Sequence, residues 1–196
     1  MSRSKRKSEW ALFNDARSKA VVFVAYCILN QNSISDGTAS YPGSIQELLE
    51  LVCGSDVGIV QMSCPELVCL GLDRGNIDGG RYPVLEENTR IHKLMSQSPA
   101  AGTIRQLAQQ LVLQISEYRN HGFDIRGIVG VNRSPTCGVD TTSRNSQEVV
   151  GKGVFIEVLR KELEKHNIHV ETVGIKAFEP EKAVKTVKPL IGPIAK

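Results

Sequence analysis

Three of the five cysteines in this sequence, Cys27, Cys64 and Cys137, each follow a hydrophobic segment at the point where the chain becomes polar. The three segments are residues 21–26, 57–62 and 128–131. Sequences with helical periodicity lie between them, which predicts a parallel sheet with crossover helices. Since parallel strands end along one edge, where open α/β sheets bind ligands, we expect the three thiols to meet there.

Three converging thiolates without an obvious fourth partner describe a metal or iron–sulfur site with an open position. Thiolates favour zinc, copper(I) and iron–sulfur clusters. The sequence lacks the C-x-x-C and H-x3-H pairs that are typical of structural zinc sites. We interpret the other two cysteines, Cys53 and Cys69, as apolar core residues. A four-iron cluster held by three cysteines would leave one iron free to bind a substrate atom, with particular affinity for sulfur.

Two of the three cysteines have neighbours that could take part in catalysis. In Cys64-Pro65-Glu66 a carboxylate lies two residues from a candidate ligand, where it could move protons. Ser134 precedes Cys137, and its hydroxyl could orient a substrate or stabilise a developing anion. A structural interpretation is also open, with Glu66 as a helix cap and Ser134 as an ordinary turn residue.

Together these motifs resemble the family that contains prokaryotic thiouracil desulfurase. Its members carry Cys-Leu-Leu-Gly after the first strand, then Asp-Gly, Cys-Pro-Glu, a Gly-Leu…Arg loop and Ser-Pro-Ser-Cys-Gly. The corresponding segments here, in the same order, are Cys27-Ile28-Leu29-Asn30, Asp36-Gly37, Cys64-Pro65-Glu66, Gly71-Leu72-Asp73-Arg74 and Ser134-Pro135-Thr136-Cys137-Gly138.

The resemblance implies a [4Fe-4S] cluster with Cys27, Cys64 and Cys137 as its ligands. It also implies that Glu66 is the acid/base residue and that Ser134 positions the substrate. The implied reaction is a desulfuration without net redox change, in which a C=S group becomes C=O and sulfide is released. The expected substrate is a small thiolated nucleobase such as thiouracil, or a related thiocarbonyl compound.

Three further residues belong to the candidate site. We expect Asp36, Arg74 and Asn132 either to bind substrate or to hold the loops around it. The chain departs from the family pattern at Ile34-Ser35, where members usually have Arg-Tyr. We therefore expect a divergent member of the family, which keeps the cluster ligands and could act on a different sulfur compound.

Three other functions fit parts of the pattern. Cys64-Pro65-Glu66 is similar to half of the zinc site of nucleoside deaminases, but the second half, Pro-Cys-x-x-Cys, is missing. A non-enzymatic iron–sulfur sensor or electron carrier would normally use four cysteines, and Cys69 or Glu66 could supply the fourth ligand. A sulfur insertion (thiolation) enzyme remains open, although the sequence has no Gly-x4-Gly-Lys-Ser/Thr nucleotide loop.

The length of 196 residues predicts one well-cored domain. We expect a polar and basic N-terminal extension over residues 1–19 and one α/β domain over residues 20–196. The fold class is a single-domain, three-layer Rossmann-like fold with a mainly parallel sheet and flanking helices. Strands are expected at residues 21–26, 56–64, 127–131 and 169–175, and helices at 44–52, 88–97, 103–120, 154–166 and 179–190. Capping boxes at residues 44–47 and 103–106 are expected to begin two of these helices.

Composition indicates where the protein is located and which classes of partner it has. An odd number of cysteines fits a reducing cytosol, so we expect a cytoplasmic protein. No apolar run is long enough to cross a bilayer, so no membrane partner is expected. Much of the net charge of +3 lies in residues 3–7, which does not require polymeric nucleic acid. The expected partner is a small thiolated substrate, and the expected state is a monomer or small homo-oligomer.

Overall fold

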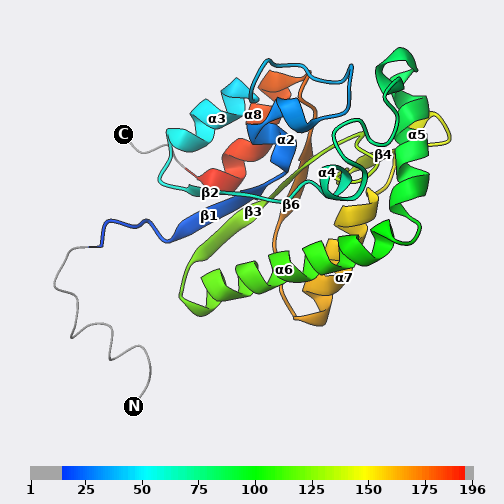
Figure 1. The fold of residues 1–196 in the computed structure, drawn as a ribbon. Coiled ribbons are helices and arrows are strands. Elements are labelled where there is room, and N and C mark those ends of the chain that lie inside the picture. The colour runs from blue at the N-terminus through cyan, green and yellow to red at the C-terminus, as the bar shows by residue number, and fades with distance from the viewer. Residues whose placement is uncertain (1–14, 193–196) are drawn as a thin grey trace.

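A four-stranded sheet, in which all neighbouring strands run parallel, lies at the centre of the molecule (Figure 1). Its strands are β1 (Ala20–Val24), β2 (Gly58–Gln61), β3 (Asp124–Val131) and β6 (Thr172–Ile175), in the spatial order β2-β1-β3-β6. This computed structural model describes residues 15–192, so the basic residues 3–7 lie outside the described part.

Helices cover both faces of the sheet. They are α2 (Tyr26–Leu29), α3 (Gln46–Cys53), α4 (Pro65–Leu70), α5 (Val84–Met95), α6 (Ala100–Asn120), α7 (Val154–Lys165) and α8 (Pro180–Ile191), with short 3-10 turns η1 (Gln31–Ser33) and η2 (Gly79–Arg81). Helices α3 and α8 pack together on one face, and α6 and α7 pack on the other (Figure 1). The predicted single-domain, three-layer Rossmann-like α/β fold is therefore confirmed.

The hydrophobic pattern explains why these elements assemble. Strand β1 reads Ala-Val-Val-Phe-Val and is buried along its whole length, as expected for a parallel strand covered on both faces. Helix α6 buries Ile104, Ala108, Leu111 and Ile115, which recur at helical spacing on one side. The two elements meet where the ring of Phe23 on β1 packs edge-on against that of Tyr118 on α6.

The order of the strands creates a crevice between β1 and β3. From β1 the chain crosses to β2 on one side, whereas from β3 it continues to β6 on the other. The connections after these two neighbouring strands therefore leave in opposite directions, which opens a space beyond their carboxyl ends. Cys27 and Cys137 lie in the segments that follow β1 and β3.

Neither of the two predicted capping boxes forms. Helix α3 has Ile45 as its N-cap, without a capping side-chain bond, so Ser44 does not form the expected capping box. Helix α6 already begins at Ala100, which places Thr103 inside the helix. The turn before it supplies carbonyl acceptors, because the N–H of Ala101 donates to Gln97 and makes a side-chain cap at residue 103 unnecessary.

A β-hairpin that the sequence analysis did not predict lies between β3 and α7. It consists of the antiparallel strands β4 (Thr141–Arg144) and β5 (Gln147–Val150). Asn145 and Ser146 connect them, both with positive φ, as two-residue hairpin turns require. These strands are short and mostly polar, so hydrophobic periodicity gives no indication of them.

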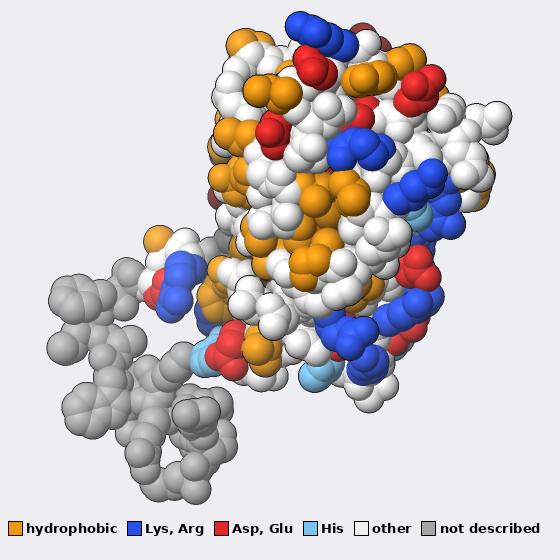
Figure 2. Space-filling view, turned by 45° about the vertical axis from the view of Figure 1, so that its right-hand side comes forward, with side chains coloured by type: hydrophobic (Ala, Val, Ile, Leu, Met, Phe, Trp, Pro, Cys, Tyr) orange, Lys and Arg blue, Asp and Glu red, His pale blue; other side chains and the backbone are white. Residues whose placement is uncertain are grey.

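The surface carries both signs of charge. On the face in Figure 2, hydrophobic side chains gather near the middle, with basic and acidic side chains around them. This face therefore has no continuous basic surface of the kind that polymeric nucleic acid binds. Among residues 15–192, no helix is both long enough and apolar enough to span a membrane.

Candidate functional site

A cavity of about 80 Å³ lies at the carboxyl end of the sheet and brings together the main residues of the predicted site. All three candidate ligands line it, together with Glu66 and Ser134. These residues come from three segments far apart in the sequence. The expectation that Cys27, Cys64 and Cys137 lie around one space at this edge is met.

Each cysteine is presented by a different local structure. Cys27 lies on the single turn of α2. Cys64 is the N-cap of α4, where Pro65 occupies the first turn and the Cys64 sulfur accepts a long hydrogen bond of 3.5 Å from the N–H of Leu67. Cys137 lies in the loop after β3, and its carbonyl accepts a 3.0 Å hydrogen bond from the N–H of Val131. Each thiol is thus held by the backbone at a strand end.

The three thiols influence one another's ionisation. Burial raises the pKa of Cys27 to about 12, and the nearby Cys64 and Glu66 add to this. Burial also raises the pKa of Cys137 well above its ordinary value, with further contributions from Cys64 and Cys27. Burial therefore favours the neutral thiols, and ionising all three in this cavity would be costly without a cationic group among them.

Three cysteine thiols are a donor set of the kind that iron–sulfur clusters, zinc and copper(I) bind. In the described part of the chain, no three His, Cys, Asp or Glu side chains converge closely enough to hold one metal ion. In a four-iron cluster each cysteine binds a different iron, so its ligands lie farther apart than those of one ion. Cys27, Cys64 and Cys137, spread around one cavity, are the residues that would hold such a cluster.

Arg74 is the most deeply buried charged residue beside the cavity, with 2% of its surface exposed. Its Nε donates to Oε2 of Glu66 at 3.0 Å. Its terminal nitrogens donate to the carbonyls of Gly71 (2.6 Å), Leu72 (3.2 Å) and Ser33 (2.5 Å). Arg74 was expected either to bind substrate or to hold the loops. These hydrogen bonds favour the second role, and they also orient Glu66.

Ser134 organises the loop that carries Cys137. Its Oγ accepts hydrogen bonds from the N–H of Cys137 at 2.9 Å and from the N–H of Thr136 at 3.2 Å. The hydroxyl acts as an acceptor in both, and its own proton reaches no acceptor among residues 15–192. Ser134 can therefore shape the loop and still donate a hydrogen bond into the cavity.

Of the other two predicted substrate contacts, Asn132 lines the cavity and Asp36 does not. Asn132 lines the cavity, but its Oδ1 accepts from the N–H groups of residues 139–141 and its Nδ2 donates to Asp140 at 2.9 Å. The amide thus holds the loop after β3. Asp36 is exposed and packs against Gly80, and it is not among the residues lining the cavity.

The two remaining cysteines lie away from the cavity. Cys69 is half-buried and packs against the hydrophobic core, close to its predicted place. The prediction that Cys53 is a core residue is wrong, because this thiol is exposed at the last position of α3. The buried side of that helix is instead formed by Leu48, Leu51 and Val52.

Several cavity residues were missed in the sequence. Arg133, Lys176 and Phe178 line the cavity, as does Asn88 of α5. Lys176 directly follows β6, so the rule that sites gather at the carboxyl ends of parallel strands would have located it.

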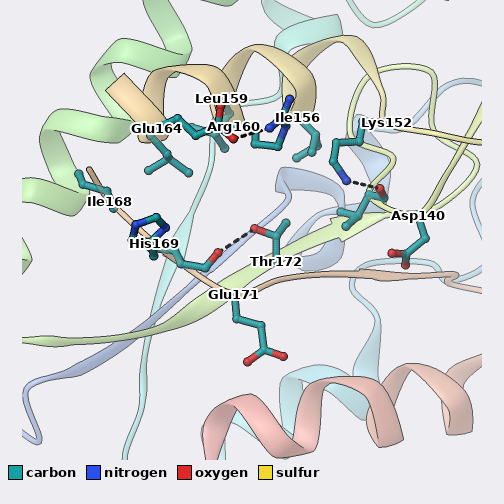
Figure 3. Close-up of a pocket in the computed structure, with 13 residues that line it drawn as sticks. Asp140, Lys152, Ile156, Leu159, Arg160, Glu164, Ile168, His169, Glu171 and Thr172 are labelled. Atoms are coloured by element: carbon teal, nitrogen blue, oxygen red, sulfur yellow. Dashed lines mark hydrogen bonds and ion pairs between the residues drawn. The ribbon is translucent and has the colours of Figure 1, made fainter. Parts of the chain in front are cut away.

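A second, larger hollow of about 490 Å³ lies between α7 and the segment leading into β6 (Figure 3). Its polar groups mostly satisfy one another. Arg160 pairs with Glu164, and Lys152 donates to the carbonyl of Val139 at 3.2 Å. No cysteine lines this hollow.

Comparison with known proteins finds a relative of similar extent. An uncharacterized protein of Methanocaldococcus jannaschii is 27% identical over 177 residues, which cover 89% of this chain and 99% of that protein. No protein-family model matches the chain. No solved structure matches it either. Since the relative is itself uncharacterized, the similarity does not indicate an activity for this chain.

Proposed function

We propose that this protein is an iron–sulfur-dependent desulfidase. Its reaction converts C=S to C=O with water and releases sulfide, without net redox change. The substrate is a small thiolated nucleobase such as thiouracil, or a related thiocarbonyl compound. The observation that carries the proposal is that Cys27, Cys64 and Cys137 line one cavity together with Glu66 and Ser134.

When bound to the three thiolates, a [4Fe-4S] cluster would supply an open iron with affinity for the thiocarbonyl sulfur. The protein supplies the proton chemistry. Glu66, oriented by Arg74, lines the cavity, where its carboxylate can take a proton from the water that attacks the carbon. The free hydroxyl proton of Ser134 can donate to the substrate and hold the reacting group in place.

Two features favour an enzyme over an electron carrier or sensor. Cys69, one candidate for a fourth ligand, is not among the residues that line the cavity. The carboxylate of Glu66, the other candidate, is already paired with Arg74. A cluster with three protein ligands and one open position serves substrate binding better than electron transfer. Sulfur insertion would use the same ligands and stays the alternative reaction.

The test is the iron and acid-labile sulfide content after anaerobic reconstitution. Cys27→Ala, Cys64→Ala and Cys137→Ala should each lose the cluster, whereas Cys53→Ala and Cys69→Ala, away from the cavity, should keep it. Sulfide release from 2-thiouracil by the loaded protein then tests the reaction, with Glu66→Gln expected to be slower by two to four orders of magnitude. Zinc in place of iron, or no metal at all, would refute the proposal.

A further inference from the structure

Two basic side chains and an aromatic ring form one wall of the cavity, and the resemblance to desulfurases assigns no role to them. Arg133 lies in the loop after β3, and Lys176 and Phe178 follow β6. The guanidinium carbon of Arg133 lies 5.0 Å from the centroid of the Phe178 ring, and the Nζ of Lys176 lies 5.7 Å from it. The ring thus keeps both cations together at the cavity.

Lys176 is held in place from the β4–β5 hairpin. Its Nζ lies 2.8 Å from Oε1 and 3.0 Å from Oε2 of Glu148 on β5. Glu148 is in turn anchored by the hydroxyl of Thr141 on β4, which donates to Oε1 at 2.7 Å. A lysine ammonium has three N–H donors, so one remains for a ligand in the cavity.

Arg133 is held by its backbone rather than by its side chain. It is a non-glycine residue with a φ of 70°, in the left-handed region. Strand β4 secures this conformation, because the N–H of Arg133 donates to the carbonyl of Thr141 at 3.1 Å and its carbonyl accepts from the hydroxyl of Ser143 at 2.6 Å. Within residues 15–192 its guanidinium forms no ion pair or hydrogen bond, so its planar donors are available to a ligand in the cavity that Arg133 lines.

We propose that Arg133 and Lys176 are specificity-determining residues that bind an acceptor oxygen of the substrate. This inference rests on the proposed desulfidase function. Both side chains can only donate hydrogen bonds, so the substrate group that faces them must be an acceptor. The ligand class is therefore a thiocarbonyl compound that also carries a carbonyl oxygen or an oxyanion such as a carboxylate. A thiocarbonyl compound without such an oxygen would leave these donors unpaired and bind weakly.

The test is steady-state kinetics of the cluster-loaded protein with 2-thiouracil and with 2-thiouracil that carries a ring carboxylate. Lys176→Met and Arg133→Met should each raise KM about tenfold to a hundredfold with little change in kcat, as expected for loss of a charged hydrogen bond made in ground and transition states alike. The control is Lys182→Met on α8, because this lysine is exposed and its pair with Glu179 lies outside the cavity. Where the KM effect appears with both compounds, the acceptor is the ring carbonyl; where it appears only with the carboxylate, the acceptor is the oxyanion.

A second variant and a second readout keep the inference separate from the proposed reaction. Glu148→Gln releases Lys176 without removing it and should raise KM less than Lys176→Met. Calorimetric binding of uracil and of its ring carboxylate needs no turnover. Weaker binding in Lys176→Met and Arg133→Met supports the inference even if wild type desulfurates nothing, in which case only the proposed function fails. The inference would be overturned if Lys176→Met and Arg133→Met turned over substrate with the same KM as Lys182→Met. It would also be overturned if the wild type bound neither compound.

Discussion

Glu66 and Arg74 lie eight residues apart in the sequence and form a buried ion pair, with 3.0 Å between Oε2 and Nε. The pair joins α4 to the loop that follows it, and the same guanidinium also reaches the carbonyl of Ser33 after β1. One arginine therefore positions the candidate acid/base group and fixes two segments that carry the cavity. Its Nη2 also lies 3.9 Å from the sulfur of Cys64.

Arg74→Met should destabilise the protein by about 3–5 kcal/mol, because it leaves the carboxylate of Glu66 buried without its partner. The measurement is the free energy of unfolding from urea titration of the cluster-free protein. The control is Arg81→Met, which removes an exposed ion pair with Asp78 and should cost no more than about 1 kcal/mol. Equal losses in the two variants would contradict a structural role for the buried pair.

Ser134→Ala should lower the free energy of unfolding by about 1–3 kcal/mol, since it removes the acceptor for the N–H groups of Thr136 and Cys137. It should also slow sulfide release, because the cavity loses a donor. Ser96→Ala is a suitable control, since Ser96 makes only an exposed bond to the carbonyl of His92. If both variants unfold alike and release sulfide at the wild-type rate, Ser134 neither orders the loop nor positions the substrate.

Alkylation of the cluster-free protein by iodoacetamide at pH 8, followed by peptide mass mapping, should modify Cys53 first. This thiol is exposed, whereas burial raises the pKa of Cys27 to about 12 and raises the pKa of Cys137 well above its ordinary value. A buried thiol with a raised pKa forms little thiolate and reacts slowly. In urea all five should react at similar rates. Fast modification of Cys27 or Cys137 in the folded protein would contradict the buried site.

Glu148→Gln should destabilise the protein at pH 7, by about 1 kcal/mol or less for such a partly exposed pair. Burial alone would raise the pKa of Glu148, but hydrogen bonds from Lys176 and Thr141 outweigh it and lower the pKa. A lowered carboxyl pKa contributes stability that is present above the unfolded value of about 4.3 and is lost as pH falls through the folded value.

The difference in urea midpoint between wild type and Glu148→Gln should therefore be largest at pH 7. It should decrease progressively below about pH 4.3. Glu164→Gln, which removes an exposed carboxylate paired with Arg160, serves as the matched control. A gap for Glu148→Gln that stays constant down to pH 3 would show that ionisation of this carboxylate does not stabilise the fold.

The fold was largely predictable because hydrophobic periodicity is local information. The continuous apolar run of β1 and the spaced apolar residues of α6 each indicate their element without knowledge of the rest of the chain. The capping boxes failed because a helix start also depends on which acceptors the preceding turn provides. The β4–β5 hairpin was not predicted from the sequence, because its polar strands are stabilised by packing on α5 and by hydrogen bonds to the loop after β3.

The sequence by itself determined that thiols follow strand ends, and hence that Cys27, Cys64 and Cys137 share one edge of a parallel sheet. Only the tertiary structure decided which polar groups meet them there. The pairing of Arg74 with Ser33, 41 residues away, and of Lys176 with Glu148, 28 residues away, depends on how loops pack across the sheet. Such contacts join side chains on separate elements, so no periodicity in the sequence encodes them.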